Sequence, residues 1–191
     1  MTPDILRDFP DQIETERLTI RAPRPGDGTA VNAAIVESWP RLQVWMDWAQ
    51  SPHPHTVAET ETFVRRSHAA FVERRDLQLL CFLRGTDVYV AGSGLHRVNW
   101  TIPRFEIGYW VRTQFEGQGY VTEAVNAITD FAFGVLGARR VEIRCDARNK
   151  ASAAVAYRAG YELEATLRCH ERAVDGSLRD TLLFARVLPE E

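Results

Sequence analysis

Hydrophobic residues alternate with polar ones at every second position in several short stretches of the chain. This period of two is typical of β-strands that bury one face. In residues 104–111, for example, Phe105, Ile107, Tyr109 and Val111 share one face of the predicted strand. The predicted strands are residues 17–21, 77–83, 88–96, 104–111, 141–145, 161–169 and 178–187.

Elsewhere apolar residues recur at intervals of three and four, which is the period of an amphipathic helix. Thr56 and Glu59 have the spacing of a capping box, and this spacing predicts the start of one helix. Asp27 is placed to cap the first helix, and Pro40 is expected to separate that helix from a second short helical piece. The predicted helices are residues 30–38, a short segment after residue 40, 56–75, 121–137 and 149–160.

The predicted elements follow one another as strand, helices, three strands, helix, strand, helix and two strands. No internal repeat and no shift in composition divides the chain. We therefore expect a single domain, residues 1–191, of the α/β class with a mixed sheet.

The formal net charge is -3, from 23 lysines and arginines against 26 aspartates and glutamates. This balance gives no basic field, so we expect no nucleic-acid partner. No stretch approaches the roughly 20 apolar residues of a membrane span. Asp4, Arg7 and Asp8 lie where a signal peptide would need apolar residues. These features predict a cytoplasmic protein without a membrane partner.

Three widely spaced cysteines, Cys81, Cys145 and Cys169, form no Cys-x-x-Cys pair. We expect them to be reduced thiols buried on strands. His53 and His55 lie on a proline-containing segment without nearby carboxylate or thiol partners. The sequence therefore predicts no metal site.

The connection from the strand at 104–111 to the next helix contains Gly117 and Gly119. Two glycines at such a junction let successive backbone N–H groups and the positive helix end converge on a phosphate. A dinucleotide-binding loop needs a third glycine where Thr122 stands, and the Gly-Lys-Ser/Thr of nucleotide triphosphate loops is absent. The connection is therefore either a phosphate site of another kind or an ordinary tight turn.

Residues 114–119 resemble the Gln/Arg-x-x-Gly-x-Gly/Ala signature of the GNAT superfamily of N-acetyltransferases. Residues 105–110 are similar to that family's central strand, and residues 149–152 are similar to its next strand-to-helix motif. Residues 16–21 and 180–186 are closest to the RimJ/RimL branch, which acetylates N-terminal amino groups of ribosomal proteins. The resemblance implies the GNAT fold, in which a mixed, mostly antiparallel and twisted sheet, flanked by helices, splays at the cofactor site.

The same resemblance implies acetyl-coenzyme A (acetyl-CoA) as the cosubstrate. Its pyrophosphate would bind the backbone of the glycine connection, and its pantetheine arm would pass Asn149. Arg112, just before the connection, is a candidate for contacting the phosphates. The residues expected at the cofactor are Tyr109, Trp110, Val111, Arg112, Glu116, Gly117, Gln118, Gly119, Tyr120, Val121, Asn149 and Ser152.

Acetyl transfer to an amine requires removal of a proton from the ammonium, stabilisation of an oxyanion and protonation of the departing thiolate. The RimL resemblance implies Ser152 as the acid and Glu171 as the base acting through water, with Glu106 a second candidate base. Many GNAT enzymes use a tyrosine as the acid, but Ala156 stands there, and Tyr157 is about 100° further round the helix. From the residues alone, Ser152 also fits a helix cap, and each glutamate also fits an ordinary surface charge or ion pair.

Trp45 and Trp48 fall in the segment with which the family walls the acceptor site, so we expect them to bind the acceptor. A protein N-terminus, such as that of a ribosomal protein, is the first choice of acceptor. A small amine, such as a polyamine, amino acid derivative or antibiotic, is the alternative. The missing tyrosine at position 156 also leaves open a CoA-binding sensor without turnover. Exposed edge strands and the tryptophan-rich segment are compatible with a homodimer.

Overall fold

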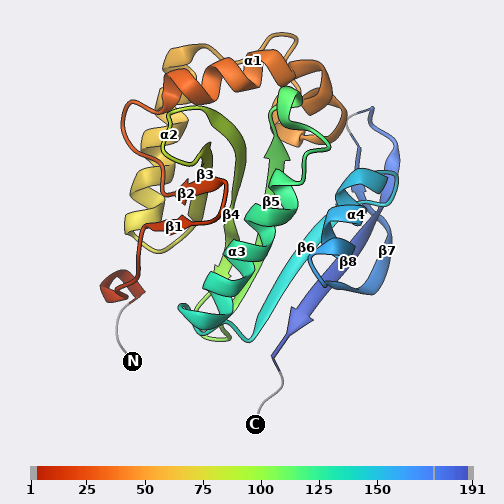
Figure 1. Cartoon of the computed structure of the whole chain (residues 1–191). Helices are drawn as coiled ribbons and strands as arrows, with labels where there is room; N and C mark the ends of the chain where they lie inside the picture. Colours follow the sequence, from red (N-terminus) through yellow and green to blue (C-terminus); the bar gives the residue numbers. More distant parts are fainter. Residues whose placement is uncertain (1–3, 174, 189–191) are drawn as a thin grey trace.

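The computed structural model describes residues 4–173 and 175–188. Its strands form one open sheet in the order β1-β2-β3-β4-β5-β6-β8-β7. β5 and β6 run parallel, and every other neighbouring pair in the described sheet is antiparallel (Figure 1). This confirms the predicted mixed, mostly antiparallel sheet. The strands are β1 Gln12–Glu14, β2 Leu18–Arg21, β3 Leu77–Leu83, β4 Tyr89–Asn99, β5 Arg104–Val111, β6 Arg140–Asp146, β7 Glu162–Arg172 and β8 Leu178–Val187.

The helices cover both faces of the sheet. They are α1 Gly28–Trp45, α2 Val57–Val72, α3 Tyr120–Gly134 and α4 Lys150–Arg158, with short 3₁₀ turns η1 Asp4–Leu6, η2 Asp47–Ala49 and η3 Thr113–Phe115. α3 and α4 pack in a core that contains Leu79, whereas α1 packs in a second core that contains Leu80. Adjacent strand residues point to opposite faces, so the two cores lie on opposite sides of β3. None of the described helices is both long and apolar enough to cross a bilayer.

The capping box at the start of α2 is confirmed. The Thr56 hydroxyl accepts from the Glu59 N–H at 3.2 Å, and the Glu59 carboxylate accepts from the Thr56 N–H at 2.7 Å. Asp27 does precede α1, but the prediction that its side chain caps the helix is wrong. Its carboxylate instead accepts two 2.7 Å bonds from Arg21 and one from the Arg24 N–H.

The prediction of two helical pieces around Pro40 is also wrong, because α1 continues through this proline. Proline removes one helical hydrogen bond, but the buried side chains of Trp39 and Leu42 hold this part of α1 against the sheet. The expectation of three buried cysteines holds only for Cys81, because Cys145 is half-buried and Cys169 is exposed. Cys169 lies on β7, the edge strand, at a register shift and at a positive φ of 49°.

β5 and β6 pair over four residues and then part. Their register runs from Arg104 opposite Arg140 to Ile107 opposite Ile143. β5 continues to Val111, and no further pairing with β6 occurs among the described residues. The sheet is therefore open at the carboxyl ends of these two strands.

The glycine connection that follows β5 is anchored from the start of β2. Glu123 in α3 accepts from the Thr15 hydroxyl at 2.6 Å, the Arg17 N–H at 3.0 Å and the Arg17 Nε at 2.6 Å. Arg17 also donates to the Gln118 carbonyl at 3.0 Å. Burial alone would raise the pKa of Glu123, but the bonds from Thr15 and Arg17 lower it below the ordinary value. Glu123 is therefore a carboxylate anion at neutral pH, and its hydrogen bonds hold the first turn of α3 in place.

We expect Glu123→Gln to lower the free energy of unfolding by about 1–3 kcal/mol at pH 7, because it weakens charge-assisted hydrogen bonds. Since the folded-state pKa is lowered, this stabilisation is present above the unfolded pKa of about 4.3 and is lost as pH falls through the folded value. Urea unfolding of both proteins at neutral and acidic pH measures the difference, which should shrink in acid.

Asp130→Asn is the matched control on the same helix. Asp130 is exposed, and its side chain makes no hydrogen bond or ion pair with the described residues. Its substitution should change the free energy of unfolding by less than about 0.5 kcal/mol. Equal losses in the two variants would contradict the anchoring role of Glu123.

Candidate active site

A cavity of about 990 Å³ opens where β5 and β6 separate. Its wall is formed by the second half of β5, the glycine connection, the start of α4, the end of α1 with η2, and residues of β6 to β8. Most of the residues predicted for the site line this one cavity: Trp45, Trp48, Glu106, Tyr109, Trp110, Val111, Glu116, Gly117, Gly119, Tyr120, Val121, Asn149, Ser152 and Glu171.

The glycine connection borders the cavity and has unused backbone N–H groups. Gly117 and Gly119 adopt positive φ angles of 71° and 83°, a conformation that other residues rarely take. Within the described part of the chain, the N–H groups of residues 117–120 donate to no protein acceptor. The first N–H groups of α3 are also free, as at any helix start. The connection can therefore cradle an anion.

Two of the predicted cofactor residues, Arg112 and Gln118, do not line the cavity. The Arg112 guanidinium contacts the Glu37 carboxylate at 2.7 Å, and the Gln118 amide donates to the Gln114 carbonyl at 2.8 Å. A phosphate contact by Arg112 stays a prediction.

Arg158, which the sequence analysis missed, lines the cavity near the glycine connection. It is exposed at the end of α4, with its Nε 3.4 Å from the Thr122 hydroxyl. No carboxylate among the described residues forms an ion pair with it. The signal available in the sequence was a basic residue in the last turn of the helix at 149–160.

Ser152 and Tyr109 form a pair of neutral hydroxyl groups near the point where β5 and β6 stop pairing. The Tyr109 hydroxyl donates to the Ser152 carbonyl at 2.9 Å and lies 3.0 Å from the Ser152 Oγ. Burial raises the pKa of Tyr109, so its phenol stays protonated at neutral pH. Asn149 caps α4 by accepting from the Ser152 N–H at 3.0 Å. The Ser152 hydroxyl is therefore not used as the helix cap.

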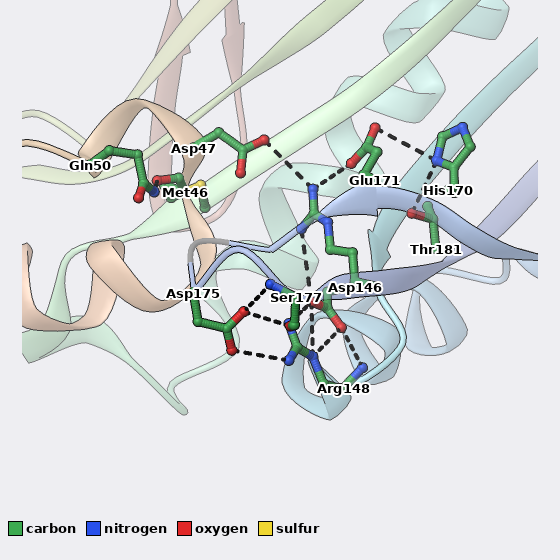
Figure 2. A network of polar contacts seen from close by, with 11 residues as sticks. Met46, Asp47, Gln50, Asp146, Arg148, His170, Glu171, Asp175, Ser177 and Thr181 are labelled. Atoms are coloured by element: carbon green, nitrogen blue, oxygen red, sulfur yellow. Dashed lines mark hydrogen bonds and ion pairs between the residues drawn. The ribbon is translucent and has the colours of Figure 1, made fainter.

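Glu171 belongs to a charged network centred on Arg179 of β8. Figure 2 labels the acidic members Asp47, Asp146 and Glu171 of this network. The Arg179 side chain is 12% exposed and forms an ion pair with Glu171. Its other contacts are Asp47 of η2 at 3.6 Å and Asp146 of β6 at 3.9 Å. Arg148 holds Asp146 in turn at 2.7 Å. Glu171 is therefore positioned by an arginine of the next strand rather than left as a free surface charge.

Glu106 lies on the face of β5 opposite the Ile107 core and is 18% exposed at its side chain. Its carboxylate is 3.3 Å from Arg97 and 3.2 Å from Arg144. Burial raises the pKa of Glu106, while Arg97 and Arg144 oppose that shift. Glu106 thus both pairs with arginines and lines the cavity, and its role as a base stays a prediction.

Aromatic side chains wall the cavity on the side of α1 and η2. Trp45 and Trp48 both line it, and Trp48 keeps 41% of its surface exposed. The Trp48 ring lies 6.2 Å from that of Trp110 on β5, in an edge-to-face arrangement. This wall can contact a flat or apolar part of an acceptor.

Residues 17–162, more than half of the chain, match the profile of the acetyltransferase (GNAT) domain. A relative named "Putative ribosomal N-acetyltransferase YdaF", from Bacillus subtilis (strain 168), is 29% identical over 156 residues, covering 80% of this chain and 82% of its own. The ribosomal-protein-serine acetyltransferase of Escherichia coli (strain K12) is 34% identical over 86 residues, 45% of this chain and 48% of its own.

Solved structures share the fold. The RimL ribosomal L7/L12 alpha-N-protein acetyltransferase in complex with coenzyme A has a TM-score of 0.83 at 24% identity, covering 93% of this chain and 98% of its own. The microcin C7 self-immunity acetyltransferase MccE, in complex with acetyl-CoA and AMP, has a TM-score of 0.85 at 22% identity, covering 94% and 98%. With the domain match over most of its length, the chain belongs to the GNAT family and is an N-acetyltransferase.

Proposed function

We propose that this protein transfers the acetyl group of acetyl-CoA to a protein N-terminal amino group by direct attack in a ternary complex. One observation carries the proposal. The free N–H groups of the glycine connection, the unpaired end of β5 and the carboxylates of Glu106 and Glu171 all border one cavity. The CoA and acetyl-CoA bound in proteins of the same fold support the cosubstrate.

The cosubstrate would be held mainly by backbone groups. The N–H groups of residues 117–121 would donate to its pyrophosphate, and Arg158 would add a positive charge at the same end of the cavity. The Asn149 oxygen caps α4, which leaves its amide N–H₂ to donate to the pantetheine arm. The thioester would then lie along the unpaired end of β5, beside Tyr109 and Ser152.

The residues of the cavity provide each proton transfer that the reaction needs. Glu171, through water, or Glu106 accepts the proton that the ammonium must lose before its nitrogen can attack. A backbone N–H near residues 109–111 stabilises the oxyanion. As the C–S bond breaks, Ser152 gives its proton to the departing thiolate and takes the remaining proton from the nitrogen of the tetrahedral intermediate. The Tyr109 hydroxyl, 3.0 Å from the Ser152 Oγ, can turn to donate to that oxygen during the exchange. No covalent acetyl-enzyme is required.

A protein N-terminus is the preferred acceptor because two similar proteins carry names that specify ribosomal or ribosomal-protein acetylation. A small amine is the second candidate, and the aromatic wall at Trp48 favours it. This ring is partly exposed inside the cavity, and a protein of the same fold binds AMP in addition to acetyl-CoA. An amine attached to a planar ring would gain from stacking there.

We expect the purified protein to acetylate at least one peptide with a free N-terminal serine or alanine when given acetyl-CoA. The panel also contains spermidine, free amino acids and an amine joined to adenosine monophosphate. Mass spectrometry would detect the acceptor that gains one acetyl mass. Acetylation restricted to small amines would overturn the protein acceptor, and no product despite CoA binding would favour the sensor function.

We further expect Ser152→Ala and Glu171→Gln each to lower kcat by about 10²-fold, the usual size of a lost general acid or base. Calorimetry should show CoA binding close to that of the parent, because backbone groups provide most contacts. Ser67→Ala in α2 and Glu162→Gln at the exposed start of β7 are matched controls that should keep the parent kcat. Parent rates in Ser152→Ala and Glu171→Gln would refute these two roles.

A further inference from the structure

Three polar residues form a row across neighbouring strands, on the face of the sheet that carries Glu106. His96 of β4 is directly opposite Glu106 of β5 in the antiparallel register. The His96 Nδ1 lies 2.8 Å from the carboxylate of Asp76, the residue just before β3. Neither Asp76 nor His96 lines the cavity, whereas Glu106 does. The row therefore leads from the cavity to a different part of the surface.

Two glycines make room for the imidazole of His96. A Cβ atom built on Gly108 would lie 3.3 Å from the His96 Cδ2 and 3.5 Å from its Nε2. A Cβ atom on Gly94 would lie 3.0 Å from the His96 Cε1, and it would also lie 2.7 Å from the Leu77 carbonyl oxygen of β3. The ring thus lies over both glycines, with Nδ1 toward Asp76 and the Nε2 edge toward β5. Gly108 itself borders the cavity.

Exposure rises along the row from the cavity to the surface. The side chains of Glu106, His96 and Asp76 are 18%, 29% and 40% exposed. An acceptor that fills the cavity would cover the open side of Glu106. A proton taken up by this carboxylate then needs another way to solvent, because it must leave before the next turnover.

We propose that His96, held by Asp76, carries the acceptor's proton from Glu106 to solvent. This inference rests on the proposed acetyl transfer and takes Glu106, the alternative to Glu171, as its base. An ammonium proton of the acceptor passes to the Glu106 carboxylate, which frees the nitrogen lone pair to attack the thioester carbon, and the C–S bond breaks in the acetyl transfer. Because His96 and Glu106 are register partners without a direct hydrogen bond or ion pair, the proton passes from Glu106 to the His96 Nε2 through a water molecule. The imidazolium releases the proton to water, and both side chains return to their starting forms.

The charged groups around Glu106 and His96 favour proton transfer from Glu106 to His96. Asp76 accepts from Nδ1–H, which leaves the Nε2 lone pair free to take a proton. Glu106 also faces Arg97 of β4 and both Arg144 and Glu142 of β6. Burial raises the pKa of Glu106, while Arg97 and Arg144 oppose that shift. A raised pKa makes the Glu106 carboxylate a better acceptor for the proton of the ammonium.

The test compares His96→Ala with the parent, using acetyl-CoA and whichever panel member the parent acetylates fastest. We expect kcat to fall at least about tenfold, with an unchanged KM for acetyl-CoA, because only proton transfer is lost. Added imidazole should restore kcat in His96→Ala and leave the parent unaffected. His68→Ala, which removes an imidazole bonded to the Pro23 carbonyl at 2.8 Å, is the matched control.

Asp76→Asn is the second variant, because it keeps the size of the side chain if His96→Ala folds poorly. It should lower kcat and shift the pH dependence of kcat, because the amide cannot stabilise an imidazolium as a carboxylate does. Parent kcat in both variants, or a loss of kcat that imidazole does not restore, would overturn the relay while leaving acetyl transfer intact. A parent protein without any acetyl transfer would overturn the proposed function instead.

Discussion

β5 and β6 pair over only four residues before they separate, and the site depends on this limit. Beyond Ile107 and Ile143, one edge of β5 has no neighbouring strand, so its backbone groups need another partner. The same separation creates the cavity. Residues of the glycine connection, of α4 and of the β7–β8 pair line it. A fully paired sheet would have covered that edge and left no room for a thioester.

Charge is arranged in matched pairs around this opening. Glu106 contacts Arg97 and Arg144, and Glu171 contacts Arg179, so each candidate base has a basic partner. Partly buried ion pairs gain little net stability because desolvation offsets their attraction. Their clearer effect is to fix orientation, since each carboxylate is held between strands rather than on a free side chain. The site is therefore organised before any acceptor enters.

Glycine serves two separate purposes near the site. At Gly117 and Gly119, which both line the cavity, the backbone needs positive φ angles that other residues rarely adopt. At Gly108 the absence of a side chain leaves space for the imidazole of His96. A glycine in the sequence does not say which purpose it serves, because the second depends on a residue from another strand.

The sequence alone determined the features that depend on near neighbours. The alternation in residues 104–111, the capping box of Thr56 and Glu59, and the glycine connection all follow from local backbone geometry. The family resemblance added the fold and the acetyltransferase activity, which the domain match supports.

Only the tertiary structure decided the partners of the charged residues. Arg179 meets Asp47, Asp146 and Glu171 from three other elements, and His96 meets Asp76 across a strand pair. The continuation of α1 through Pro40 likewise depends on packing against the sheet. These contacts join residues far apart in the chain. The local spacing of residues does not predict which distant side chain will lie beside a given charged group, because the fold of the whole chain sets that neighbour.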